Sequence, residues 1–111
     1  MTSDSGRDPV YLRKVDELIA DLTRQLDDFD PDELEAEPTE GVLKLTFADG
    51  SRCVLNRQAA ANQVWLAEGA TAWHFELDDQ DQWIDTKGRG ELRVILSEVI
   101  ERKLGRPTKL I

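Results

Sequence analysis

The stretch "GVLKLTFADGSRCVLNRQ", residues 41–58, decides the fold, because it has the pattern of two β-strands joined by a tight turn. Apolar and polar residues alternate along "VLKLTF", as they do in a strand with one buried face. Asp49-Gly50 is a typical two-residue hairpin turn, and the returning run over residues 52–56 is rich in β-forming residues. We therefore predict an antiparallel hairpin.

Further strands are predicted on both sides of this hairpin. Upstream, "ELEAE" over residues 33–37 also alternates and is expected to form an edge strand. Downstream, β-forming runs over residues 63–67, 71–77 and 82–85 are separated by short polar turns. Tight turns between neighbouring strands imply antiparallel pairing, so we expect one sheet of five to six strands.

An amphipathic helix is predicted before the sheet. Between residues 10 and 29, apolar side chains recur at three- and four-residue spacing, which is typical of one buried stripe. Pro31 disfavours helical geometry at Asp30, so the helix should end near there, with Asp27 and Asp28 in its last turn.

A second amphipathic run, over residues 89–104, ends at Gly105 and Pro107. Two such helices can together cover one face of a sheet. The prediction is an α+β fold: a two-layer α/β sandwich with the N- and C-terminal helices packed on one face of an antiparallel sheet.

Composition limits the class of protein. The chain has 111 residues, 40% hydrophobic and 33% charged, which fits a single domain over residues 1–111, with residues 1–8 expected to be flexible. Fourteen basic and 23 acidic residues give a net charge of −9, which repels nucleic acid and anionic membranes and attracts cations and basic protein surfaces. Without a signal peptide or a long apolar run, we expect a soluble, cytoplasmic protein.

The sequence offers little material for catalysis, and we expect no enzyme. Cys53 and His74 are the only residues of their kinds, and no phosphate-binding glycine loop, HExxH or CxxC motif occurs. We interpret Cys53 as a small buried hydrophobe and His74 as a solvated residue of the sheet. A single cysteine also excludes an internal disulfide.

Carboxylates crowd the stretch "LDDFDPDELEAE", residues 26–37, which contains no Lys or Arg. An EF-hand register starting at Asp28 fails, because position 6 is Glu33 instead of Gly and position 12 is Thr39 instead of Glu. Carboxylates without His or Cys suit weak, exchangeable and poorly selective binding of hard cations such as Mg²⁺, Ca²⁺, Mn²⁺, Fe²⁺ or Fe³⁺. The alternative is a solvated face that discourages edge-to-edge aggregation. The candidate ligands, here called the acidic ridge, are Asp27, Asp28, Asp30, Asp32, Glu33 and Glu35.

Trp65 is the candidate anchor for a partner protein. Because strand side chains alternate, Val64 and Leu66 point one way, and Trp65 and Gln63 point the other. An outward Trp beside hydrogen-bonding groups is typical of protein–protein hot spots, but a Trp packed across neighbouring strands fits the pattern equally well. The candidate partner-binding residues are Trp65, Asn56, Arg57, Gln58 and Gln63.

Several stretches together resemble the bacterial frataxins, the CyaY family. They are "QLDDFD" at the end of the first helix, the hairpin "GVLKLTFADGSRCVLNRQ", then "QVWLAEG" and "WHFELDDQDQWID", followed by an amphipathic helix. The resemblance spans nearly the whole chain. It implies the frataxin fold and a role in iron–sulfur cluster assembly.

The resemblance also implies sites and partners. Members of the family bind iron weakly through carboxylates of the first helix and first strand, which correspond here to Asp27, Asp28, Asp30, Glu33 and Glu35, with Asp32 and Glu37 as neighbours. They dock on the cysteine desulfurase and the iron–sulfur scaffold, and the outward tryptophan corresponds to Trp65. We expect a monomer, with oligomerisation in excess iron as an open alternative. A metal-independent interaction module, formed by the acidic ridge and Trp65, is the second hypothesis.

The chain departs from the family pattern beside the ridge. Thr23 and Arg24 occupy positions where the family often carries glutamates, so part of the ridge is missing or is replaced by Asp21.

Overall fold

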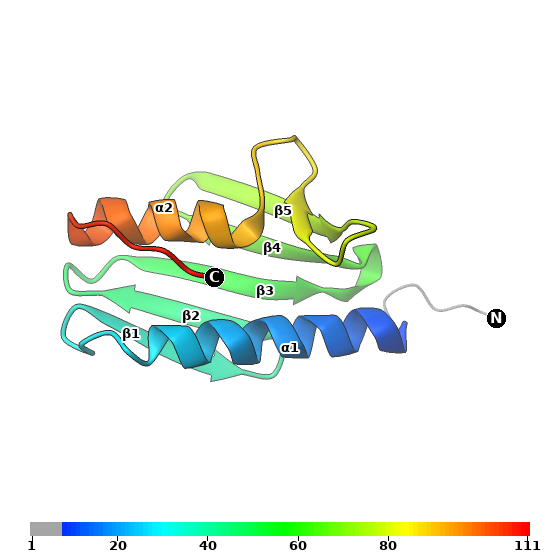
Figure 1. The fold of residues 1–111 in the computed structure, drawn as a ribbon. Helices are drawn as coiled ribbons and strands as arrows, with labels where there is room; N and C mark the ends of the chain where they lie inside the picture. Colours follow the sequence, from blue (N-terminus) through cyan, green and yellow to red (C-terminus); the bar gives the residue numbers. More distant parts are fainter. Residues whose placement is uncertain (1–7) are drawn as a thin grey trace.

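Two helices cover one face of a six-stranded antiparallel sheet in the computed structural model, which describes residues 8–111 (Figure 1). The helices are α1 (Pro9–Leu26) and α2 (Leu92–Leu104). The strands, in chain order across the sheet, are β1 (Leu34–Thr39), β2 (Val42–Phe47), β3 (Arg52–Gln58), β4 (Gln63–Glu68), β5 (Thr71–Leu77) and β6 (Trp83–Asp85). The predicted two-layer α+β sandwich is confirmed. No helix within residues 8–111 is long and apolar enough to cross a bilayer.

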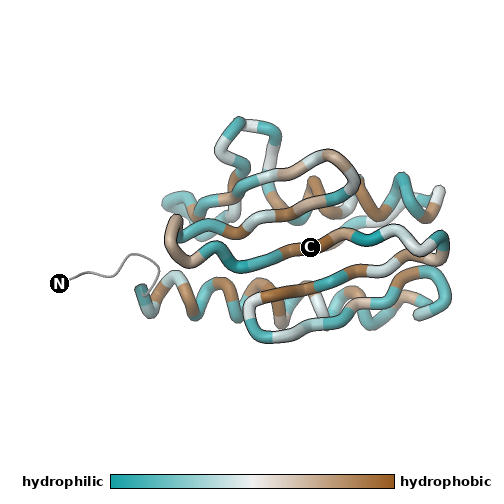
Figure 2. The backbone as a smooth tube through the Cα atoms, turned by 180° about the vertical axis from the view of Figure 1, so that it is seen from behind, coloured by the Kyte–Doolittle hydropathy of each residue, from teal (hydrophilic) through white to brown (hydrophobic). Residues whose placement is uncertain are grey.

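The hydrophobic core lies between the helices and the covered face of the sheet. In β2, Leu43, Leu45 and Phe47 are buried and the residues between them are half-buried, as expected when strand side chains alternate. The buried stripe of α1 consists of Tyr11, Val15, Leu18, Ile19, Leu22 and Leu26. Figure 2 shows the opposite side of the sheet, which no helix covers; we call it the open sheet face.

The hairpin between β2 and β3 has a longer loop than the sequence predicts. Phe47 N–H donates to the carbonyl of Ser51 at 2.9 Å, and Gly50 N–H donates to the carbonyl of Phe47 at 2.8 Å. The loop therefore has three residues, 48–50, and Gly50 takes the left-handed conformation at φ +85°. The prediction of a two-residue turn is wrong, because Asp49 uses its carboxylate to accept the Ser51 N–H at 2.8 Å.

Helix α1 ends earlier than predicted. Its last residue is Leu26 and Asp27 is the C-cap, so Asp27 and Asp28 lie beyond the last turn instead of within it. After Asp27, the backbone tightens: Asp28 and Phe29 donate their N–H groups to carbonyls three residues back. At the other end of α1, the carboxylate of Asp8 caps the helix by accepting the Val10 N–H at 2.9 Å. The expected flexibility of residues 1–8 otherwise lies outside the described residues.

The segment after α2 folds back between the two helices (Figure 1). Gly105, at φ +72°, caps α2, and the chain then returns between α2 and α1 (Figure 1). Leu110 is buried in the core, and the backbone N–H of Ile111 donates to the side-chain oxygen of Gln25 at 2.9 Å. This segment therefore ties the two helices together.

Candidate functional site

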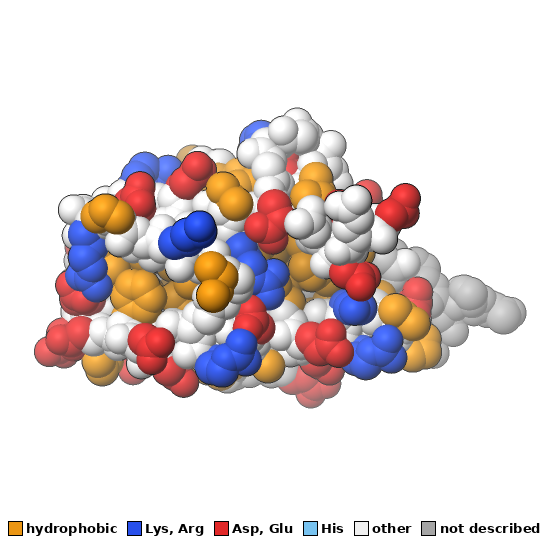
Figure 3. Space-filling view, viewed as in Figure 1, with side chains coloured by type: hydrophobic (Ala, Val, Ile, Leu, Met, Phe, Trp, Pro, Cys, Tyr) orange, Lys and Arg blue, Asp and Glu red, His pale blue; other side chains and the backbone are white. Residues whose placement is uncertain are grey.

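The acidic ridge lies at the junction between α1 and β1. Asp27 and Asp28 follow the helix, Asp30 and Asp32 form the connecting turn, and Glu35 lies on the edge strand β1. These five side chains are exposed, and Glu33 is half-buried. Figure 3 shows acidic side chains gathered at this end of the helical face, at the lower left of the view.

Tertiary contacts give this acidic stretch basic partners that its own sequence lacks. Arg106, from the segment after α2, places Nη1 at 2.5 Å from Oε2 of Glu33. Lys44 on β2 lies 3.3 Å from the carboxylate of Glu37, its cross-strand neighbour. The hydrogen bond from Arg106 holds the pKa of Glu33 below its usual range. Within residues 8–111, Glu33 is therefore the one carboxylate of the ridge whose charge is neutralised by an ion pair.

The ridge does not form a ready-made chelate. Within residues 8–111, no group of three or more His, Cys, Asp or Glu side chains lies close enough together to hold one ion. Carboxylate oxygens are hard donors, which suit hard cations, but one ion placed here would meet fewer than three such side chains within residues 8–111. Gathering more of these exposed side chains around one cation would cost conformational entropy.

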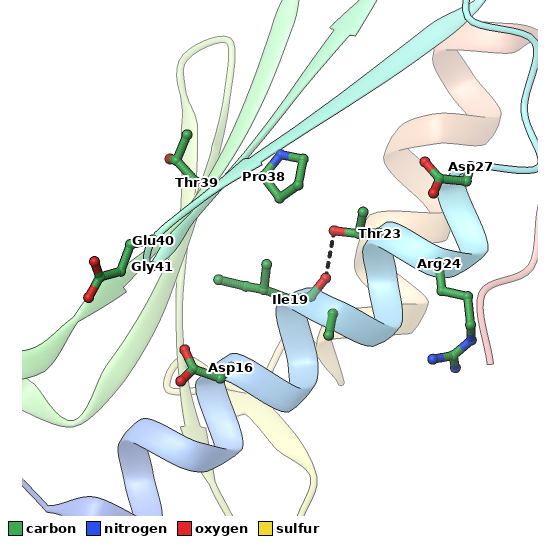
Figure 4. Close-up of a pocket in the computed structure, with 10 residues that line it drawn as sticks. Asp16, Ile19, Thr23, Arg24, Asp27, Pro38, Thr39, Glu40 and Gly41 are labelled. Carbon is green, nitrogen blue, oxygen red and sulfur yellow. Dashed lines mark hydrogen bonds between the residues drawn. The ribbon is translucent and has the colours of Figure 1, made fainter.

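A groove of about 480 Å³ separates α1 from the turn between β1 and β2 (Figure 4). Thr23 lines it one turn before Asp27, and its hydroxyl donates to the carbonyl of Ile19 at 2.7 Å. Arg24, also at the groove, pairs with Asp21. Neither side chain supplies a carboxylate, so the acidic ridge does not continue along this side of the groove.

Asp21 does not replace the missing glutamates. Its carboxylate accepts hydrogen bonds from Arg93 of α2 at 2.7 Å and from Gln25 at 2.9 Å. Asp21 therefore joins α1 to α2 instead of facing the groove, and the expectation that it extends the ridge is wrong.

Trp65 lies on the open sheet face and is held there by two contacts. Its ring stacks on His74, directly opposite on β5, with 4.0 Å between ring centroids and 10° between planes. Its Nε1–H donates to the side-chain oxygen of Gln63 at 2.8 Å. Trp65 thus combines both predicted features, because it is half-buried by cross-strand packing and still presents part of its ring to the outside.

The other predicted partner-binding residues divide between the two faces of the sheet. Asn56 lies opposite Trp65, and Gln58 lies opposite Gln63, so these side chains share the open sheet face. Arg57 lies opposite the buried Val64 and therefore points to the helical side. There it reaches within 3.9 Å of Glu40. The prediction that Arg57 lies on the same sheet face as Trp65 is wrong, because successive residues of a strand face opposite ways.

Cys53 and His74, the only side chains considered for catalysis, lie in different environments. Cys53 is fully buried in the covered face of the sheet, and burial raises the pKa of its thiol to about 12. The thiol is then protonated at neutral pH and behaves as a small hydrophobe, as the sequence predicts. His74 is half-buried against Trp65.

Sequence reasoning missed Arg106. It lies 73 residues from Glu33 in the chain, so no local spacing or periodicity connects the two. Only the charge imbalance of residues 26–37 signalled that some basic group should approach this stretch.

Together, the fold and the site define a class of protein: a small α+β sandwich with an acidic junction between its first helix and edge strand and a tryptophan on its open sheet face. The frataxin-like domain model matches residues 5–106. The iron–sulfur cluster assembly protein CyaY of Paraburkholderia phymatum is 32% identical over 103 residues, covering 93% of this chain and 96% of the relative. That of Cupriavidus metallidurans is 36% identical over 93 residues, covering 84% and 82%.

Solved structures agree in fold. A frataxin from Psychromonas ingrahamii superposes with a TM-score of 0.85 at 21% identity, covering 94% of this chain and 97% of that one. A trimeric frataxin from Saccharomyces cerevisiae, complexed with ferrous iron, superposes with a TM-score of 0.64 at 23% identity, covering 96% and 90%. The chain belongs to the frataxin family, and within it to the bacterial, CyaY-type frataxins.

Proposed function

We propose that this protein is a non-catalytic, iron-binding regulator of iron–sulfur cluster assembly. The acidic ridge takes up Fe²⁺ or Fe³⁺ weakly and exchangeably, and the protein acts on the cysteine desulfurase and scaffold complex, with iron donation as one use of the bound metal. The observation that carries the proposal is the ridge itself, where five exposed carboxylates have no ion pair within residues 8–111. The names of the relatives and the ferrous complex of a yeast frataxin support it.

The experiment is an NMR titration of the ¹⁵N-labelled protein with ferrous iron under anaerobic conditions, followed by the desulfurase. Paramagnetic broadening should begin at residues 27–35 and spare the far end of the sheet. Asp27→Asn with Asp28→Asn should weaken the response, because two oxygen donors lose their charge. The matched control, Asp79→Asn with Glu98→Gln, removes two exposed carboxylates elsewhere and should leave the response unchanged. Uniform broadening, or none, contradicts iron capture by the ridge.

A second function is favoured by Trp65, whose side chain is fixed on the open sheet face by its contacts with His74 and Gln63. In this alternative, the ridge and Trp65 bind the desulfurase without metal, through charge complementarity and an aromatic anchor. Calorimetry of desulfurase binding with and without ferrous iron separates the two functions. The interaction-only function predicts equal affinity in both titrations, whereas the iron-dependent one predicts a difference.

A further inference from the structure

A basic side chain from the far end of the chain lies inside the acidic ridge. Arg106 follows Gly105, whose left-handed conformation turns the chain back after α2. Nη1 of Arg106 lies 2.5 Å from Oε2 of Glu33, and its guanidinium carbon lies 5.8 Å from the ring centroid of Phe29. The guanidinium thus contacts a carboxylate and an aromatic ring that both belong to the acidic junction.

The segment that carries Arg106 is anchored on its far side. Thr108 N–H donates to the carboxylate of Glu101 at 3.1 Å, and Leu110 N–H donates to the hydroxyl of Ser97 at 2.8 Å. The Leu110 side chain is buried in the core. Arg106 is therefore tethered beside Glu33, and its effective concentration there exceeds that of a free cation in solution.

No other basic side chain of the described part of the chain is ion-paired with the ridge. The neighbouring bases of α2, Arg102 and Lys103, lie 3.3 and 3.6 Å from the carboxylate of Glu68 instead. Arg106 is thus the one internal cation of the ridge within residues 8–111.

A cation bound at Glu33 must compete with this guanidinium. The Glu33 oxygen that accepts the hydrogen bond from Arg106 is not free to ligate a metal with the same lone pair, and the positive charge of Arg106 repels a second cation. Loss of Arg106 would leave Glu33 next to the charge of Asp30 with no counter-ion, which favours uptake of an external one.

We propose that Arg106 is an affinity-determining residue of the acidic ridge: a tethered cation that competes with divalent metal for Glu33. The proposal rests on the proposed function in taking ferrous iron as the ligand of the ridge. The new element is that the segment after α2 lowers the affinity of the ridge for ferrous iron.

Anaerobic calorimetry with ferrous iron, together with chemical shifts of the Glu33 amide, tests the proposal. Arg106→Gln should tighten iron binding about threefold to tenfold, because one surface ion pair no longer competes with the metal. Arg106→Lys keeps the charge and should bind iron within about twofold of the parent. The matched control Arg102→Gln removes the same charge from α2, away from the ridge, and should also stay within about twofold.

Each outcome decides the proposal. Equal affinities for Arg106→Gln and Arg102→Gln overturn it and leave the ridge as a metal site. If Arg106→Gln binds iron and the parent protein does not, the result supports competition by Arg106 but counts against iron capture by the parent protein. No response at residues 27–35 in either protein overturns both proposals. If Arg106→Gln lowers the melting temperature markedly, Arg106→Met, which keeps the apolar stem against Phe29, replaces it.

Discussion

Asp85 is buried (2% exposed) at the end of β6, yet it keeps its charge because the loop after it supplies donors. Its carboxylate accepts hydrogen bonds from the Arg89 side chain at 2.8 and 3.0 Å, and from the backbone N–H groups of Arg89 and Lys87. The hydrogen bonds from Arg89 hold the pKa of Asp85 below its usual range. This carboxylate stabilises the connection from the sheet to α2 and has no part in the ridge.

Acid should therefore remove a defined contribution to stability. Because the pKa of Asp85 is lower in the folded than in the unfolded protein, the folded state binds fewer protons there. The contribution is complete above the unfolded pKa, near 3.8, and is lost as the pH falls through the lower folded pKa. Asp85→Asn should cost about 2 kcal/mol at neutral pH and make the melting temperature less dependent on pH below about 4.

The control is Asp79→Asn, which neutralises an exposed carboxylate of the neighbouring loop. Melting temperatures measured across this pH range should separate the two variants. A pH dependence of Asp85→Asn equal to that of the parent would contradict the assignment.

At the scale of elements, the hairpin between β2 and β3 depends on one backbone conformation. Gly50 has φ +85°, and a Cβ at this position would meet no atom within 4 Å. An alanine there would suffer only backbone strain and no clash. The cost of substitution therefore reports the turn itself.

Gly50→Ala should lower the free energy of unfolding by about 1 kcal/mol, because an L-residue is strained in the left-handed region. Gly50→Asn should lose less, since Asn tolerates that region better. Urea unfolding of both variants measures the difference. Equal stability of Gly50→Ala and the parent would mean that the turn does not have this conformation.

The end of α1 carries charge that works against stability. Asp27 caps the helix and Asp28 follows it, close to the negative end of the helix dipole and to each other. Neither carboxylate has an ion pair within residues 8–111. Such an arrangement is expected where charge is retained for binding.

Asp27→Asn with Asp28→Asn should therefore raise the free energy of unfolding, by about 0.5 to 1 kcal/mol at low salt, while weakening metal binding. The gain should shrink at high ionic strength, because salt screens exposed charges. Thermal unfolding at two salt concentrations measures both effects. Unchanged or lower stability at low salt would count against repulsion at this site.

For the whole molecule, the segment after α2 joins parts that are distant in the chain. It contributes Arg106 to the ridge and a buried Leu110 to the core, and the backbone of Ile111 both donates to and accepts from the side-chain amide of Gln25 on α1. The two helices make contact with the sheet separately, and this segment packs between them (Figure 1). Its loss should therefore affect both stability and the ridge.

Leu110→Ala should cost about 2 to 4 kcal/mol, because the side chain is 6% exposed and its removal leaves a cavity. Ile111→Ala is the matched control: its side chain is 80% exposed, and the substitution should change stability by less than about 0.5 kcal/mol. Chemical denaturation compares the two. Similar effects at both positions would show that the segment does not pack as described.

The sequence by itself determined the layers of this protein. Alternation along "VLKLTF" and the apolar stripe of α1 are local, periodic signals, and burial of one face follows from them directly. The acidic crowding of residues 26–37 was equally visible, and so was Trp65 on the open sheet face.

Only the tertiary structure decided which groups meet. The contact between Arg106 and Glu33 spans 73 residues, and the stacking of Trp65 on His74 depends on the register of β4 against β5. The position of Arg57 on the helical side likewise follows from the pairing of β3 with β4. Periodicity specifies which face of its own element a side chain occupies, whereas the partner on another element is set by how the elements pack.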